Sequence, residues 1–346
     1  MQKNRKFYAL LTLLCAATLF FVPFLTVKRD NPVAPVNVPA AATEKTTKTA
    51  PSPTSTTDAV AALKAETFTV LHADGKTKSQ ISCYDFLRFT LAAEMLPSFE
   101  PEALKAQAVA SYTYFCYERE REKENPQKAL CGADFADTPV PFPDGYTAAY
   151  WKKKWGDKTY GSAMKKLSAA VEAVAGVKIT YDGKPILAAY HAISSGKTDG
   201  AEAVWAAAVP YLQSVDSAAD KNAPDYITTA RFSAEEFKAA LKDVPGISLA
   251  ADPKTWVADD AVCSAAGTVL KQTVGTVALT GKEWRERFGL RSACFSVAYK
   301  DGGFTFTVKG NGHGVGLSQY GAQFAALDGA DYREILHRYY TDVKIE

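Results

Sequence analysis

The stretch from Leu91 to Tyr117, LAAEMLPSFEPEALKAQAVASYTYFCY, constrains this chain most, because two prolines fix where its helices end and begin. Pro97 ends a helix predicted over 84–94, since the residue before a proline disfavours the helical region. Pro101 suits the first turn of the next helix, where its missing N–H costs nothing. Helical spacing predicts one buried face on that second helix, made by Leu104, Ala108, Tyr112 and Phe115.

Glu94 lies near the C-terminal end of the first of these helices. The helix dipole there disfavours negative charge, and the apolar neighbours Met95 and Leu96 add desolvation. Both effects predict a raised pKa, which suits a general acid. Composition alone favours the alternative that Glu94 is an exposed surface residue. The charged run over 118–124 is interpreted as a solvated face with alternating signs.

The N-terminal part differs in composition from the rest of the chain. Residues 1–29 place basic residues before an apolar run over 7–27, which is about the ~20 residues that a membrane-crossing helix needs. They predict an uncleaved signal anchor, with the remainder outside the cytoplasm. Residues 30–65 are rich in Pro, Ala and Thr and predict a disordered linker. The formal net charge of +2 gives no argument for binding nucleic acid.

A second unusual stretch, GNGHGVGLSQYGAQ, runs from Gly310 to Gln323. Its closely alternating glycines predict unusual backbone angles or close backbone approach. The spacing matches neither a P-loop nor GxGxxG, which argues against a phosphate site. We interpret the stretch as a rigid loop that places His313, Gln319 and Tyr320 beside a cleft shared with Glu94. The alternative is that Gln319 and Tyr320 only pack the loop onto the domain.

These patterns predict an α+β domain over 66–346. A helical segment over 84–175 carries Glu94 and packs against a strand-rich segment over 177–310, with the cleft between them. A strand over 186–190 leads to His191, and the chain closes with two short helices, over 318–327 and 332–340. Ser318 is expected to cap the first of the two.

Four collinear motifs, which together cover roughly 66–346, resemble the stage II sporulation protein D family. They are EMLPSFEPEALKAQAVA at the opening stretch, HAISSGKTDGAEAVWAAAVPYLQSVDS over 191–217, LTGKEWRERFGLRSACFSV over 279–297 and GNGHGVGLSQYGA over 310–322. The resemblance implies a lytic transglycosylase of spore-forming bacteria with Glu94 as catalytic acid/base. It further implies cleavage of the β-1,4 bond between N-acetylmuramic acid and N-acetylglucosamine during forespore engulfment.

One carboxylate can suffice for such a reaction. A glycoside hydrolase needs a second carboxylate, whereas a lytic transglycosylase uses the C6 hydroxyl of its substrate as nucleophile and leaves a 1,6-anhydro end. The resemblance implies peptidoglycan glycan strands stripped of stem peptides as substrate. It implies a cell-wall amidase and a membrane protein of the engulfment complex as partners, single-pass membrane localisation and no cofactor. A non-catalytic glycan-binding amidase enhancer and a structural component of a wall-remodelling complex remain alternatives.

The resemblance adds candidate substrate-binding residues and two departures. The candidates are Gln107, His191, Ser194 and Ser195, besides His313, Gln319 and Tyr320, and each has a structural role as its alternative. Some clostridial members hold zinc with one His and two Cys after the long helix. The corresponding region here, 130–150, keeps only Cys131, so no metal is expected. Tyr112 stands where the family commonly has an arginine, which could orient the acid.

Overall fold

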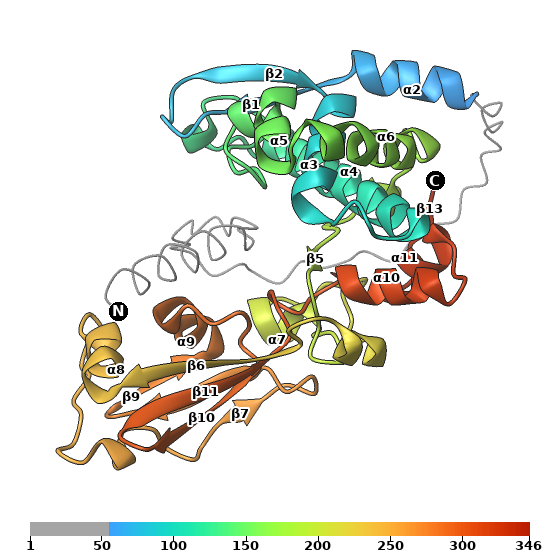
Figure 1. Ribbon diagram of the computed structural model, residues 1–346. Coiled ribbons are helices and arrows are strands. Elements are labelled where there is room, and N and C mark those ends of the chain that lie inside the picture. The colour runs from blue at the N-terminus through green and yellow to red at the C-terminus, as the bar shows by residue number, and fades with distance from the viewer. Residues whose placement is uncertain (1–54) are drawn as a thin grey trace, which may run out of the picture.

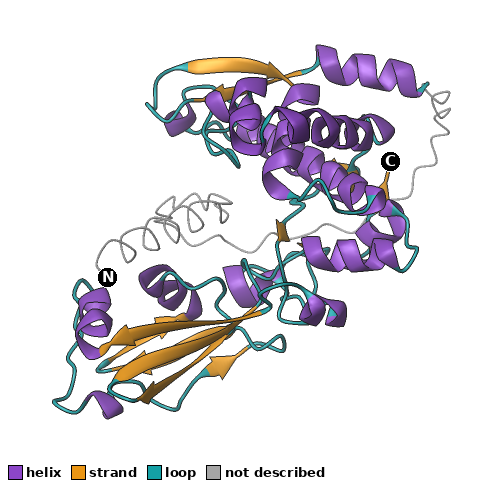
Figure 2. Cartoon of the chain, in the orientation of Figure 1, coloured by secondary structure: helices purple, strands orange, loops and turns teal. Residues whose placement is uncertain are grey.

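The computed structural model describes residues 55–346 and has the α+β architecture that the sequence predicts. Figure 1 shows the helices between residues 56 and 173 at one end of the molecule and a strand-rich part, from β6 (Ile227–Ser233) to β11 (Gly303–Lys309), at the other. The C-terminal helices α10 (Gln319–Leu327) and α11 (Tyr332–Tyr339) lie between them. Figure 2 shows most of the helices at one end, beside a strand hairpin, and the other long strands, flanked by further helices, at the opposite end.

The helical end begins with a helix, a hairpin and the two helices of the opening stretch. These elements are α2 (Thr56–Ala65), β1 (Thr67–Leu71), β2 (Lys78–Ser82), α3 (Cys83–Glu94), α4 (Pro101–Glu124), α5 (Ala148–Trp155) and α6 (Asp157–Ala173). Ser82 caps α3, because its side chain accepts a hydrogen bond from the Asp85 N–H, and Pro101 occupies the first turn of α4. The helix boundaries predicted from these residues are therefore confirmed to within a residue.

The strand-rich end contains two antiparallel three-stranded sheets, with strand orders β10-β11-β6 and β7-β8-β9. Its elements are β6 (Ile227–Ser233), α8 (Ala234–Leu241), β7 (Val262–Cys263), β8 (Val269–Val274), β9 (Val277–Thr280), α9 (Gly281–Phe288), β10 (Phe295–Lys300) and β11 (Gly303–Lys309). Ser233 and Thr280 begin α8 and α9 with capping boxes.

Short elements join the two ends. They are β3 (Ile179–Tyr181), β4 (Lys184–Pro185), β5 (Tyr190–His191), α7 (Ala201–Trp205), β12 (Leu317–Ser318), α10 (Gln319–Leu327), α11 (Tyr332–Tyr339) and β13 (Lys344–Ile345). The β5 and β12 strands pair in parallel, with Tyr190 opposite Leu317 and His191 opposite Ser318. This pairing brings the residues around His191 beside the start of α10.

Two large hydrophobic clusters form the core of the described residues. One cluster contains residues from 63 to 212 and from 315 to 343, and it packs α3, α4, α6, α10 and α11 together. The other contains residues from 237 to 308 and packs α8 and α9 on the strands. The chain therefore leaves the first core, builds the second, and returns to the first through the glycine-rich loop.

Three local predictions are corrected. The linker predicted for 30–65 ends earlier, because Thr56–Ala65 is helical and buries Leu63. The charged run over 118–124 is not wholly solvated: Glu118 and Glu122 are buried, and Glu118 pairs with Arg121 at 2.5 Å. The strand predicted over 186–190 is limited to Tyr190–His191.

The single-pass membrane localisation predicted from the sequence is also corrected. Among residues 55–346, no helix is long and apolar enough to cross a bilayer. The anchor predicted over 1–29 and the first part of the predicted linker, 30–54, lie outside the described residues.

Candidate active site

Glu94 is the last residue of α3, and its side chain is only 6% exposed. It is buried because most residues of α3 are covered, with α4 and α6 packed against this helix. Burial raises the pKa of Glu94 to about 7, because it penalises the charged carboxylate more than hydrogen bonds from Gln319 and Tyr190 favour it. The predicted direction of this pKa shift is confirmed, and the alternative of an exposed surface glutamate is excluded.

The structure brings the two unusual stretches of the sequence together at this carboxylate. Gln319 Nε2 donates to Glu94 Oε2 at 3.3 Å and to Gln107 Oε1 at 3.3 Å. Gln107 Nε2 donates in turn to Ser111 Oγ at 3.0 Å. The hydroxyl of Tyr190 donates to Glu94 Oε1 at 3.4 Å. Both carboxylate oxygens therefore accept a hydrogen bond, and four elements (α3, α4, β5 and α10) contribute to one buried polar network.

The glycine-rich loop lies against the segment around β5, as the sequence predicts for its backbone. Gly310, Gly312, Gly314 and Gly316 all have positive φ, from 73° to 112°. A Cβ on Gly316 would lie 2.1 Å from the Ala189 carbonyl oxygen, so only glycine fits there. This close approach lets β12 pair with β5 and sets the position of Gln319 at the start of α10.

His191 and His313 lie beside each other but do not reach Glu94 by any hydrogen bond in the described residues. Their ring centroids are 5.7 Å apart, and Trp205 is 5.5 Å from His313. His191 Nδ1 lies 3.1 Å from the Val315 carbonyl oxygen, and His313 Nδ1 accepts from the Val315 N–H at 3.1 Å. Burial lowers the pKa of His191 to about 4 and that of His313 to about 3, so both rings are neutral near pH 7.

In this structure the hydroxyls of Ser194 and Ser195 form hydrogen bonds with backbone groups. Ser194 Oγ accepts from the Gly196 N–H at 3.1 Å, and the Ser194 N–H donates to Asp220 Oδ2 at 2.7 Å. Ser195 Oγ donates to the Ala266 carbonyl oxygen at 2.6 Å. The Ser195 contact joins the loop after β5 to the strand-rich part, and the Ser194 N–H joins it to Asp220. The roles of both serines in binding substrate stay predictions.

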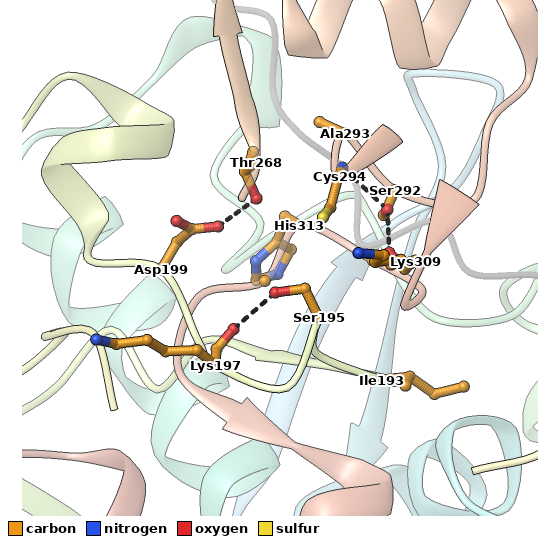
Figure 3. Close-up of a pocket in the computed structure, with 12 residues that line it drawn as sticks. Ile193, Ser195, Lys197, Asp199, Thr268, Ser292, Ala293, Cys294, Lys309 and His313 are labelled. Atoms are coloured by element: carbon orange, nitrogen blue, oxygen red, sulfur yellow. Dashed lines mark hydrogen bonds between the residues drawn. The ribbon is translucent and has the colours of Figure 1, made fainter. Parts of the chain in front are cut away.

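A small polar hollow lies where the two parts of the molecule meet (Figure 3). Its cavity volume is about 10 Å³, which is room for roughly one water molecule. Thr268 Oγ1 donates a hydrogen bond to Asp199 Oδ2 at 2.5 Å, and Figure 3 shows His313 in the centre of the hollow. Its lining includes Ser195, Lys197, Lys309 and His313, but not Glu94. The predicted cleft for an extended ligand therefore stays a prediction.

Tyr320 and Tyr112 have structural contacts. The Tyr320 ring packs edge-to-face on Phe99, with centroids 5.0 Å apart, and so joins α10 to the turn after Glu94.

The Tyr112 hydroxyl donates to Glu66 Oε2 at 2.7 Å, beside Arg119. No hydrogen bond of the described residues joins Tyr112 to Glu94. Tyrosine at this position therefore supports the packing of α4 rather than the orientation of the acid.

Among residues 55–346, there is no group of three or more His, Cys, Asp or Glu side chains placed to hold a metal ion. The five cysteines in this part of the chain are all unpaired, and Cys131 is exposed.

Tyr190 and Ser111 belong to the network around Glu94 but were not predicted from the sequence, and neither was Asp220, which lies outside that network. In the sequence Tyr190 is only the last residue of the strand predicted over 186–190, and adjacent strand residues point to opposite faces, so the prediction for His191 gives no signal for Tyr190. Asp220 lies in a short 3-10 helix, Ala218–Asn222, and is completely buried. Nothing in its sequence context distinguishes Asp220 from the other acidic residues of polar loops.

Comparisons with known proteins agree with the motifs. The family model for stage II sporulation protein matches residues 73–181. Stage II sporulation protein D of Bacillus amyloliquefaciens is 36% identical over 276 residues, 80% of this chain and 77% of that protein. The protein of that name in Bacillus subtilis is 33% identical over 343 residues, 99% of this chain and 96% of the relative. The amidase enhancer of Bacillus subtilis is 26% identical over 302 residues, which cover 73% of this chain and 39% of that protein.

Proposed function

The chain belongs to the stage II sporulation protein D family, whose members act in sporulation, and we propose that it is a peptidoglycan lytic transglycosylase. Its substrate would be peptide-free glycan strands, cleaved between N-acetylmuramic acid and N-acetylglucosamine during forespore engulfment. The single observation that carries this proposal is the environment of Glu94: a buried carboxyl with a pKa raised to about 7 and a hydrogen-bond donor at each oxygen.

A carboxyl with that pKa can act as acid and then as base. Near pH 7 a substantial fraction of Glu94 is protonated and can donate its proton to the glycosidic oxygen of the leaving sugar. The carboxylate that remains is stabilised by donation from Gln319 and Tyr190. It can then accept the proton of the C6 hydroxyl of the muramic acid residue, whose oxygen bonds to C1 and closes the 1,6-anhydro ring.

These steps need no second carboxylate and no added water. The proton that Glu94 gives to the leaving oxygen is replaced by the proton of the C6 hydroxyl, so the residue returns to its starting state. The glycosidic C1–O bond breaks and the C1–O6 bond forms.

The proposed contacts of the glycan remain Gln107, His191, Ser194, Ser195, His313, Gln319 and Tyr320. The proposed partners are the amidase that removes stem peptides and a membrane protein of the engulfment complex.

A second candidate function is non-catalytic enhancement of a cell-wall amidase. The match to the amidase enhancer favours it, because the name of that relative describes the enhancement of an amidase and not a reaction on glycan. In this case Glu94 would serve to bind glycan or to hold α3 against α10. The two candidates differ in whether covalent bonds of the glycan change.

Incubation of the purified protein with peptide-free glycan strands, followed by mass spectrometry of the products, tests the proposal. We expect 1,6-anhydro ends, which are one water lighter than hydrolysis products, and their loss in Glu94→Gln. Glu118→Gln is the matched control, since Glu118 is also a buried glutamate but belongs to the far end of α4. Binding of the strands by the wild-type protein without cleavage would refute catalysis and support the second candidate.

A further inference from the structure

Asp220 is a buried carboxylate that connects three separate segments of the chain. Its Oδ2 accepts hydrogen bonds from the Ser194 N–H at 2.7 Å and from Ser318 Oγ at 2.6 Å. Its Oδ1 accepts from Ser217 Oγ at 3.2 Å, and Ser217 is itself 2.8 Å from the Tyr339 hydroxyl. The donors to Asp220 are neutral groups of serine residues. Burial of a carboxylate at zero exposure costs free energy when no positive charge accompanies it. We therefore expect Asp220 to hold the segments that donate hydrogen bonds to it.

The start of α10 passes directly over this carboxylate. Ser318 caps α10, because its Oγ accepts from the Gly321 N–H at 3.2 Å while it donates to Asp220. A Cβ on Gly321 would lie 2.8 Å from Asp220 Oδ1 and 2.0 Å from the Tyr339 hydroxyl. The first turn of α10 is therefore held in contact with Asp220 by a hydrogen bond and by the lack of a side chain at Gly321.

Gln319 is the residue that depends on this contact. It follows Ser318 directly, and its amide uses one N–H for Glu94 Oε2 and the other for Gln107 Oε1. Both distances are 3.3 Å, near the upper end of a hydrogen bond. A small displacement of the α10 start would therefore break them.

We propose that Asp220 is a positioning residue of the active site: through Ser318 it fixes the start of α10 and so holds the Gln319 amide against Glu94. The inference rests on the proposed function for its catalytic meaning, but the geometric claim concerns Asp220, Ser318, Gln319 and Glu94 alone. Because Asp220 is fully buried, its role is to position its neighbours and not to contact substrate.

The hydrogen-bond chemistry provides a matched pair of variants. Ser318 has one hydroxyl proton, and donation of it to an acceptor at position 220 leaves its oxygen free to cap Gly321. In Asp220→Asn the amide oxygen can still accept from Ser194 and Ser318, and the new N–H₂ can donate to Ser217 Oγ. In Asp220→Ala no acceptor remains. Asparagine therefore preserves the positioning while it removes the charge, and alanine removes both.

The direct test is a titration of the Glu94 carboxyl by NMR on the protein labelled with ¹³C in glutamate, with Glu94→Gln for assignment. Loss of the Gln319 hydrogen bond, which favours the ionised form, should raise the Glu94 pKa by about one pH unit in Asp220→Ala. Asp220→Asn should titrate like the wild type. Asp220→Ala combined with Gln319→Ala should shift no further than either variant, because both remove the same interaction. The ionisable neighbours of Glu94, Tyr190 and Tyr146, are unchanged in these variants.

The proposal is overturned if Asp220→Ala folds and Glu94 titrates as in the wild type while Gln319→Ala shifts it. An equal shift in Asp220→Asn and Asp220→Ala would also overturn it, since the charge rather than the hydrogen bonds would then matter. If Asp220→Ala does not fold, Ser318→Ala, which removes the link to Asp220 together with the cap on the Gly321 N–H, should give the same shift. The titration needs no substrate, so the positioning role and the proposed reaction can fail independently.

Discussion

Replacement of Glu94 by glutamine should stabilise the protein at alkaline pH and not at acid pH. The carboxyl has a pKa of about 7 in the folded protein against an ordinary value of 4.5. At about 1.4 kcal/mol per pH unit, this difference corresponds to about 3 kcal/mol of stability. Between about pH 4.5 and about pH 7, Glu94 keeps its proton in the folded state but loses it in the unfolded chain. The contribution is therefore fully present below about pH 4.5 and is lost as the pH rises through about 7.

Glutamine has nearly the same shape and stays neutral, so Glu94→Gln removes this pH dependence. Urea denaturation of both proteins at about pH 4.5, 6 and 8 measures the free energy of unfolding. Relative to the wild type, the free energy of unfolding of the variant should rise by up to about 3 kcal/mol between about pH 4.5 and about pH 8. Glu235→Gln, which removes an exposed carboxylate on α8, is the control. A difference between Glu94→Gln and wild type that stays constant with pH would refute the claim that Glu94 is buried with a raised pKa.

Three further predictions concern the surroundings of Glu94. Gln319→Leu removes a donor that favours the ionised carboxylate, so the alkaline limb of the pH–rate profile for anhydro-product formation should move up by about one pH unit. Tyr112→Phe should lower the free energy of unfolding by about 1 kcal/mol through loss of the bond to Glu66, with product formation unchanged in the same assay. Gly316→Ala should destabilise by about 3 kcal/mol in urea denaturation because its Cβ would meet the Ala189 carbonyl; Gly329→Ala, also at positive φ but with open space around it, should cost only about 1 kcal/mol.

Much of the local structure could be predicted from residues close together in the sequence. Pro97 and Pro101 separate α3 from α4, and Ser82 and Ser318 cap their helices, because prolines and capping side chains act within a few residues. The alternating glycines predicted the positive φ angles for the same reason. The motif order identified the family, which the comparisons then confirmed.

Predictions that depended on solvent exposure were less secure. Composition favoured a linker through residue 65 and a solvated face over 118–124, but α2 packs through Leu63 and two of the glutamates are buried. Whether a polar segment is covered depends on what folds against it. In both cases the covering residues come from other parts of the chain, and no local pattern shows them.

The sequence by itself determined the positions of α3, of the start of α4 and of the closing helices α10 and α11, the conformation of the glycine loop and the family to which the chain belongs. Only the tertiary structure decided that Glu94 is buried, that Gln319 and Tyr190 donate to it, and that Asp220 holds the start of α10. The physical reason is that a pKa and a buried hydrogen bond depend on groups in contact, and here those groups come from residues 94, 190, 220 and 319. Such contacts form only when the chain returns from the strand-rich part to the first core.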